Sequence, residues 1–151
     1  MNAFELLTRL TENQIDSLFR AASALPADKL DWQPSANTRS ALDQLQEVAT
    51  ALDVFWASFT ERKIEWSDEM FAEWKESRSK ITSLAELESK TRESTKKLVE
   101  FMKGLSAEDL TKPVELPFPG SYTLADVLAY HYWNMSYHEG QITMIGMLLQ
   151  A

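Results

Sequence analysis

The residues best suited to chemistry in this chain lie together late in the sequence. Its two histidines, His131 and His138, flank Asn134 in a segment whose apolar residues recur at helical spacing. At about 100° of rotation per residue, both histidines fall on the inward stripe and Asn134 lies on its flank. An uncompensated buried polar group costs about 1–3 kcal/mol. These side chains must therefore satisfy one another or line a site.

The spacing of these three residues permits metal ligation. Asn134 and His138 are four residues apart and lie one above the other on a helix face, as two ligands from one helix require. His131 comes three residues before Asn134 and is an alternative as a ligand, as a hydrogen-bond donor behind the ligands, or as a general base. The chain contains no Cys, so any ligand or nucleophile is nitrogen- or oxygen-based. It also has no Gly-x-Ser-x-Gly motif, which argues against a serine hydrolase.

Composition limits the class of protein. The 151 residues, of which 44% are hydrophobic and 25% charged, predict one folded domain covering residues 1–151. A net charge of −8 without a basic cluster argues against a nucleic-acid partner. No signal peptide is recognisable, and no apolar run approaches the roughly 20 residues of a membrane span. We therefore expect a cytoplasmic protein without a membrane partner.

The apolar periodicity predicts an all-α fold. Helices are expected from Asn2 to about Leu25, from Ser40 along an apolar stripe that reaches Phe59, from Ser83 to near Gly104, and from Thr123 to about Leu149. Four amphipathic helices can bury their stripes only against one another, which predicts a four-helix bundle. The connections should contain short extra segments, namely a helix or lid in residues 63–80 and an extended stretch in residues 113–120.

The aromatic residues are expected mainly in the core. Trp56 and Phe59 lie on the stripe of the second helix and fit a buried position. Trp66, Phe71 and Trp74 are harder to place. They could cover the open end of the bundle, form a dimer surface, or build a small satellite core.

Three short motifs carry a resemblance to a known family. They are Trp32-x-Pro34, Ser40 followed seven residues later by Glu47-Val48-Ala49, and the run His138-Glu139-Gly140-Gln141-Ile142. In order and spacing over nearly the whole chain, this pattern resembles the DinB/YfiT-like superfamily. The resemblance implies an up-down-down-up bundle, often a homodimer. It also implies a Zn or Ni site built from three histidines, one on the second helix and two spaced four apart on the fourth. The activities it implies are metal-dependent hydrolysis and thiol S-transfer.

Carried onto this sequence, the three ligand positions are Glu47, Asn134 and His138, of which only one is a histidine. The helical wheel also places Glu47 away from the main stripe of its helix. Two interpretations follow. In one, Zn or Ni at His138, with Glu47, Asn134 or His131, activates water or a thiol. In the other, the protein has lost the three-histidine site and keeps a polar pocket around His138 for small-molecule binding or a stress-associated role. The two missing histidines favour the second.

Overall fold

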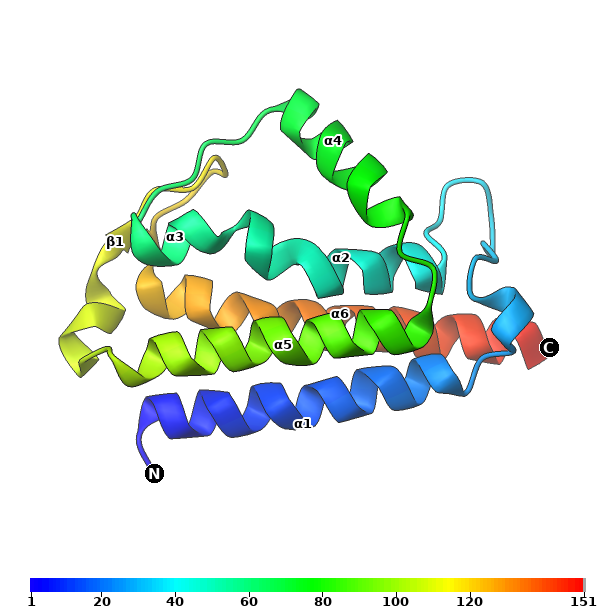
Figure 1. The fold of residues 1–151 in the computed structure, drawn as a ribbon, viewed down its shortest axis with the longest axis horizontal. Coiled ribbons are helices and arrows are strands. Elements are labelled where there is room, and N and C mark those ends of the chain that lie inside the picture. Colours follow the sequence, from blue (N-terminus) through cyan, green and yellow to red (C-terminus); the bar gives the residue numbers. More distant parts are fainter. Residues whose placement is uncertain (151) are drawn as a thin grey trace.

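Four long helices packed side by side form the body of the molecule. The structure is a computed structural model that describes residues 1–150, and the long helices are α1 (Ala3–Ser23), α2 (Ala41–Val54), α5 (Leu84–Lys103) and α6 (Leu124–Gln150). Figure 1 shows α1 and α6 running in one direction and α2 and α5 in the other. This up-down-down-up arrangement confirms the predicted all-α four-helix bundle.

Short elements fill the connections. They are the 3₁₀ helix η1 (Ala27–Lys29), α3 (Trp56–Thr60), α4 (Asp68–Ser79), the 3₁₀ helix η2 (Ala107–Thr111), and the two-residue strands β1 (Pro113–Val114) and β2 (Tyr122–Thr123). The strands pair antiparallel, with Pro113 opposite Thr123. The connection from α2 to α5 contains α3 and α4 and returns along the length of the bundle (Figure 1), which is why α2 and α5 are parallel.

The long helices begin where the sequence predicts. The side chain of Asn2 accepts a hydrogen bond from the backbone N–H of Glu5, and the Glu5 carboxylate accepts one from the backbone of Asn2. Ser40 and Ser83 cap α2 and α5 with their hydroxyl oxygens, which accept from the backbone N–H groups of Asp43 and Glu86. These contacts satisfy backbone N–H groups that have no partner within the first turn. The chain thus enters each helix at a defined residue.

The second helix is interrupted, contrary to the expectation of one stripe reaching Phe59. Helix α2 ends at Val54, and Phe55 has φ −91° and ψ 10° before α3 begins at Trp56. The ring of Phe55 leaves the bundle axis and packs against Trp66, Trp74 and Tyr130. Phe59 remains in the core at 2% exposure, whereas Trp56 is only partly buried. The break lets Phe55 and Phe59 pack into two different clusters.

Helix α4 lies outside the bundle against α2 (Figure 1). Trp66, Phe71 and Trp74 contact one another, and Trp66 and Trp74 also contact Phe55. The indole N–H of Trp74 donates to the hydroxyl of Thr50 at 2.8 Å. These contacts match a small satellite core, one of the three roles that the sequence left open for these aromatic residues. This cluster holds α4 on the bundle.

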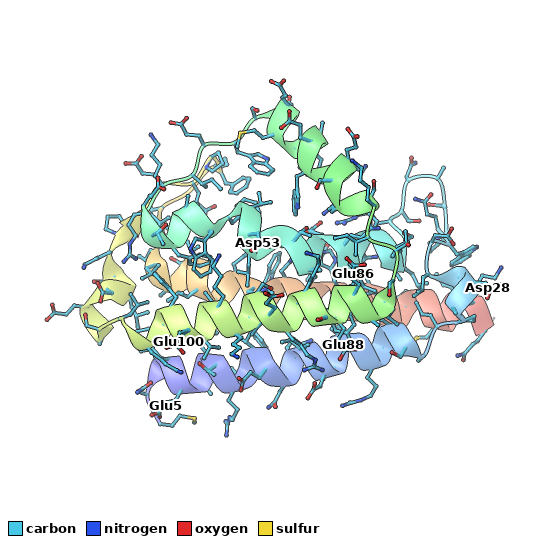
Figure 2. The ribbon with its side chains drawn as sticks, viewed as in Figure 1. Glu5, Asp28, Asp53, Glu86, Glu88 and Glu100 are labelled. Atoms are coloured by element: carbon cyan, nitrogen blue, oxygen red, sulfur yellow. The ribbon has the colours of Figure 1, made fainter. Side chains whose placement is uncertain are left out.

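The surface is acidic but its carboxylates are dispersed. Figure 2 shows Glu5 on α1, Asp53 on α2, and Glu88 and Glu100 at separate points along α5, rather than gathered in one patch. None of the helices in residues 1–150 combines the length and apolar content that crossing a membrane requires.

We expect Phe59→Ala to lower the free energy of unfolding by about 3–5 kcal/mol, because it removes a large, fully buried ring. Trp56→Ala should cost less, since part of that ring already contacts solvent. Urea denaturation measures both changes. Met70→Ala, at a residue 43% exposed, is the control and should change stability by less than about 0.5 kcal/mol. Equal losses for Phe59 and Trp56 would contradict the burial described above.

Candidate functional site

His138 lies at the centre of a buried group of polar side chains between α2 and α6. Its Nδ1 is 2.9 Å from Oε1 of Gln44 and 3.2 Å from Oε1 of Gln141, and its Nε2 is 3.2 Å from Oε1 of Glu47. The amide nitrogen of Gln44 points at the backbone carbonyl of Arg39, so its oxygen faces the histidine. Because oxygen acceptors face both ring nitrogens, both contacts are satisfied only when each nitrogen carries a hydrogen. Gln44 and Glu47 thus hold the ring between them, one at each nitrogen.

The second carboxylate oxygen of Glu47 is held by two arginines. Nη1 of Arg39 donates to Oε2 at 2.6 Å, and Nη1 of Arg78 lies 3.4 Å from the same oxygen. Arg39 precedes α2, whereas Arg78 comes from α4 with a side chain only 2% exposed. Asp43 joins the two cations, because it accepts hydrogen bonds from Arg39 and, at 3.0 Å, from Nη2 of Arg78. We call Arg39, Asp43, Glu47, Arg78 and His138 the charge cluster.

The electrostatics of the cluster keep Glu47 ionised. Burial by itself would raise the pKa of its carboxyl group. The hydrogen bond with His138 and the charge of Arg39 outweigh burial and lower this pKa to about 2. A carboxylate with so low a pKa is a poor general base at neutral pH. Its chemistry is that of a fixed counter-ion.

Asn134 and His131 are buried one and two turns before His138, respectively, and lie outside the charge cluster. Nε2 of His131 is 2.9 Å from the hydroxyl of Thr95, which itself donates to the carbonyl of Thr91 at 2.7 Å. Nε2 is therefore the donor, and Nδ1 has no partner within residues 1–150. Burial lowers the pKa of His131 to about 4, so the ring is neutral at neutral pH. The amide nitrogen of Asn134 likewise lacks a partner in this range.

This arrangement does not fit a catalytic metal ion. Of the four residues that sequence comparison points to, the fold brings Glu47 and His138 into direct contact, and it leaves Asn134 and His131 outside their hydrogen-bond network. Within residues 1–150, no three His, Asp or Glu side chains converge closely enough to hold a metal. The oxygens of Glu47 already accept from one imidazole and two guanidinium groups. A divalent cation would have to enter beside two fixed cations.

Sequence reasoning missed the two arginines. Arg39, Asp43 and Glu47 are spaced four apart, the interval at which opposite charges meet along one side of a helix. The sequence therefore contained enough information to predict this part of the cluster. No local pattern in the sequence indicates that Arg78 belongs to it. Arg78 reaches Glu47 only because α4 folds back over α2, 31 residues further along the chain.

A cavity of about 480 Å³ opens near the break between α2 and α3. Its wall is mainly apolar and aromatic, and it includes Phe55, Phe59, Leu116, Phe118, Tyr130 and Trp133. His131 also contributes to the wall. The volume lies within the range of small-molecule sites, which are typically mostly apolar with a few placed polar groups.

Comparisons with known proteins agree with this fold. The chain belongs to the DinB family, whose model matches residues 1–149. The chain is also similar to the crystal structure of a DinB-like protein, YjoA, from Bacillus subtilis, with a TM-score of 0.64 and 14% identity. That likeness covers 97% of this chain and 92% of the other and concerns the fold alone. The comparison with curated proteins finds no match.

We expect Glu47→Gln to destabilise the protein at pH 7 by about 3 kcal/mol, because it removes one of the two carboxylates that neutralise the buried guanidinium group of Arg78. The folded pKa of Glu47 lies below its usual 4.5, so its contribution is complete above pH 4.5 and is lost as the pH falls toward about 2. The difference in unfolding free energy between wild type and variant should therefore shrink across this window.

Urea denaturation at a series of pH values measures this difference. Glu100→Gln is the matched control, because the Glu100 side chain is 73% exposed and its loss should cost less than about 0.5 kcal/mol. A difference between wild type and Glu47→Gln that stayed constant from pH 7 to pH 3 would contradict the assignment of Glu47 as a buried counter-ion.

Proposed function

We propose that this protein is a metal-independent member of the DinB family that binds a small molecule. The observation that carries the proposal is the state of Glu47. Its carboxylate stands at the position that the family resemblance assigns to a metal ligand, and it is neutralised by Arg39, Arg78 and His138. The cluster thus supplies its own cations where a metal ion would supply charge.

The small-molecule part of the proposal is supported by the cavity near the break between α2 and α3, which no residue of the charge cluster lines. The charge cluster is filled by its own side chains, whereas the cavity offers about 480 Å³ of largely apolar space. The polar residues around His138 then act as a rigid support for α2, α4 and α6. The proposed binding site differs from the pocket around His138 that the sequence suggested, because the cavity is lined by His131 and not by His138.

The alternative is a metal-dependent hydrolase or thiol S-transferase that uses His138 with Glu47, Asn134 or His131 and binds Zn or Ni. It requires Glu47 to release both arginines, and it requires Asn134 or His131 to turn toward His138. Asparagine binds metals only weakly through its carbonyl oxygen. We therefore rank this alternative second.

Protein purified without chelator or a histidine tag should contain Zn and Ni at far below one equivalent by elemental analysis. Neither EDTA nor added Zn or Ni should shift its melting temperature. A site that bound metal would stabilise the folded state by about 2.7 kcal/mol at a hundredfold excess over Kd. Roughly one equivalent of metal, with a lower melting temperature in EDTA, would instead establish the metal-dependent alternative.

A gain-of-ligand variant provides the control. Glu47→His combined with Asn134→His restores three histidines at the family positions, and we expect it to bind Zn or Ni far more tightly than wild type in a calorimetric titration. If it bound no better, positions 47, 134 and 138 would not be the ligand positions. Glu47 would then not occupy a ligand position of the family.

We also propose that the protein forms a homodimer through the outer face of α6. Tyr137, Met144, Met147 and Leu148 are 47–61% exposed on this face, while the opposite face of the helix is already buried in the bundle. A helix that is apolar on both sides usually has both sides covered.

Light scattering should accordingly give about twice the monomer mass of 17.3 kDa. Met147→Glu places a charge in the proposed interface and should shift the mass toward the monomer. Met70→Glu, on α4, should leave the mass unchanged. A wild-type mass equal to that of one chain would refute the dimer.

A further inference from the structure

The unpartnered nitrogen of His131 indicates which ligand the cavity takes. His131 is 1% exposed, and it forms part of the cavity wall. Its Nε2 is directed to Thr95 on α5, which does not line the cavity. The two nitrogens of an imidazole point in nearly opposite directions, so Nδ1 faces away from Thr95. It is a buried hydrogen-bond acceptor without a donor in residues 1–150.

Three other polar side chains in the wall already form hydrogen bonds. The hydroxyl of Ser58 donates to the carbonyl of Phe55 at 2.6 Å, and that of Tyr122 donates to the carbonyl of Pro119 at 2.9 Å. Asp126 accepts from both the backbone and the hydroxyl of Thr123 at 2.7 Å. Tyr130 and Trp133 also line the cavity, but these residues are 37% and 55% exposed, so water can reach their polar groups. Among the polar atoms of the wall residues, Nδ1 of His131 is the one that is both buried and without a partner in residues 1–150.

We propose that the cavity binds a neutral, flat aromatic compound with a single hydroxyl or N–H group that donates a hydrogen bond to Nδ1 of His131. This inference rests on the proposed function and specifies its ligand class. Phe55, Phe59, Tyr130 and Trp133 offer ring faces and edges to an aromatic ligand. The donor on the ligand removes the cost of leaving Nδ1 buried and unpaired.

The charges around the cavity select a neutral ligand. An ion entering an apolar wall loses its hydration without gaining a counter-ion, because His131 is neutral. The carboxylate of Asp126 in the wall adds repulsion for anions; hydrogen bonds from Thr123 hold the pKa of that carboxyl below its usual range. Aromatic acids are therefore expected to bind more weakly than the corresponding phenols.

Three probes of similar shape test the inference in calorimetric titrations at neutral pH in EDTA. They are 2-naphthol, which carries a donor, its methyl ether 2-methoxynaphthalene, which carries none, and the anion 2-naphthoate. We expect 2-naphthol to bind one to one, about five- to tenfold more tightly than the ether, and 2-naphthoate to bind most weakly. Equal binding of 2-naphthol and the ether, or no binding of 2-naphthol, would overturn the inference without any variant.

Variants locate the contact. His131→Leu should make 2-naphthol and its ether bind equally. Thr95→Val removes the acceptor that fixes the ring tautomer and should also reduce the preference, although it changes no atom of the cavity wall. Ser94→Ala, a neighbouring buried hydroxyl on α5, is the matched control and should leave the preference intact. A preference unchanged in His131→Leu would assign the donor contact to another residue and refute the inference.

Two further measurements complete the test. Long-range ¹⁵N–¹H NMR of the imidazole should show the Nε2–H tautomer, with a change in the Nδ1 shift when 2-naphthol binds. Val127→Phe should fill the cavity and abolish binding of both naphthyl probes; persistent binding would place them elsewhere. Binding of 2-naphthol only with added Zn would contradict the proposed function, whereas loss of the hydroxyl preference in metal-free protein would contradict only the present inference.

Discussion

The neutralisation of one partly buried carboxylate, that of Glu47, organises the middle of this protein. Glu47 lies between α2 and α6, where an isolated negative charge would be strongly unfavourable. One of its oxygens faces the imidazole of His138, and the other accepts from Arg39 and Arg78. These partners come from the loop before α2, from α4 and from α6. The requirement to neutralise one charge therefore ties three separate parts of the chain together.

This constraint explains why α4 packs where it does. Hydrophobic contact of Trp66 and Trp74 with Phe55 brings α4 against α2, and Arg78 then inserts its guanidinium group between Asp43 and Glu47. The same guanidinium lies 4.5 Å from the ring centre of Trp74, which contributes a cation–π contact. A buried ion pair is weak evidence for net stability, but breaking it is costly. The main effect of the cluster is thus to fix the position of α4 on the bundle, and its net contribution to the stability of the fold is smaller.

The two ends of the polar face of α6 have opposite characters. At His138 every ring nitrogen has a partner, and the carboxylate opposite is ionised and occupied. One or two turns earlier, Nδ1 of His131 and the amide nitrogen of Asn134 lack partners. A fully satisfied polar network rigidifies a core, whereas an unsatisfied buried group is a place where a ligand can contribute. The capacity for binding therefore lies on the His131 side of the helix.

Much of the fold follows from local sequence. The caps at Asn2, Ser40 and Ser83 and the 3.6-residue periodicity determine the four helices and hence the bundle, because helix starts and apolar stripes are properties of neighbouring residues. The spacing of Arg39, Asp43 and Glu47 likewise predicts part of the charge cluster, because these residues are close in the sequence. Tertiary structure alone decided the rest. The helix break at Phe55, the approach of Arg78 and the missing partner of His131 all depend on how α4 and α5 meet α2 and α6, through contacts between residues 24 to 36 positions apart. Such contacts leave no periodic trace in the sequence, because each depends on the docking of a whole helix.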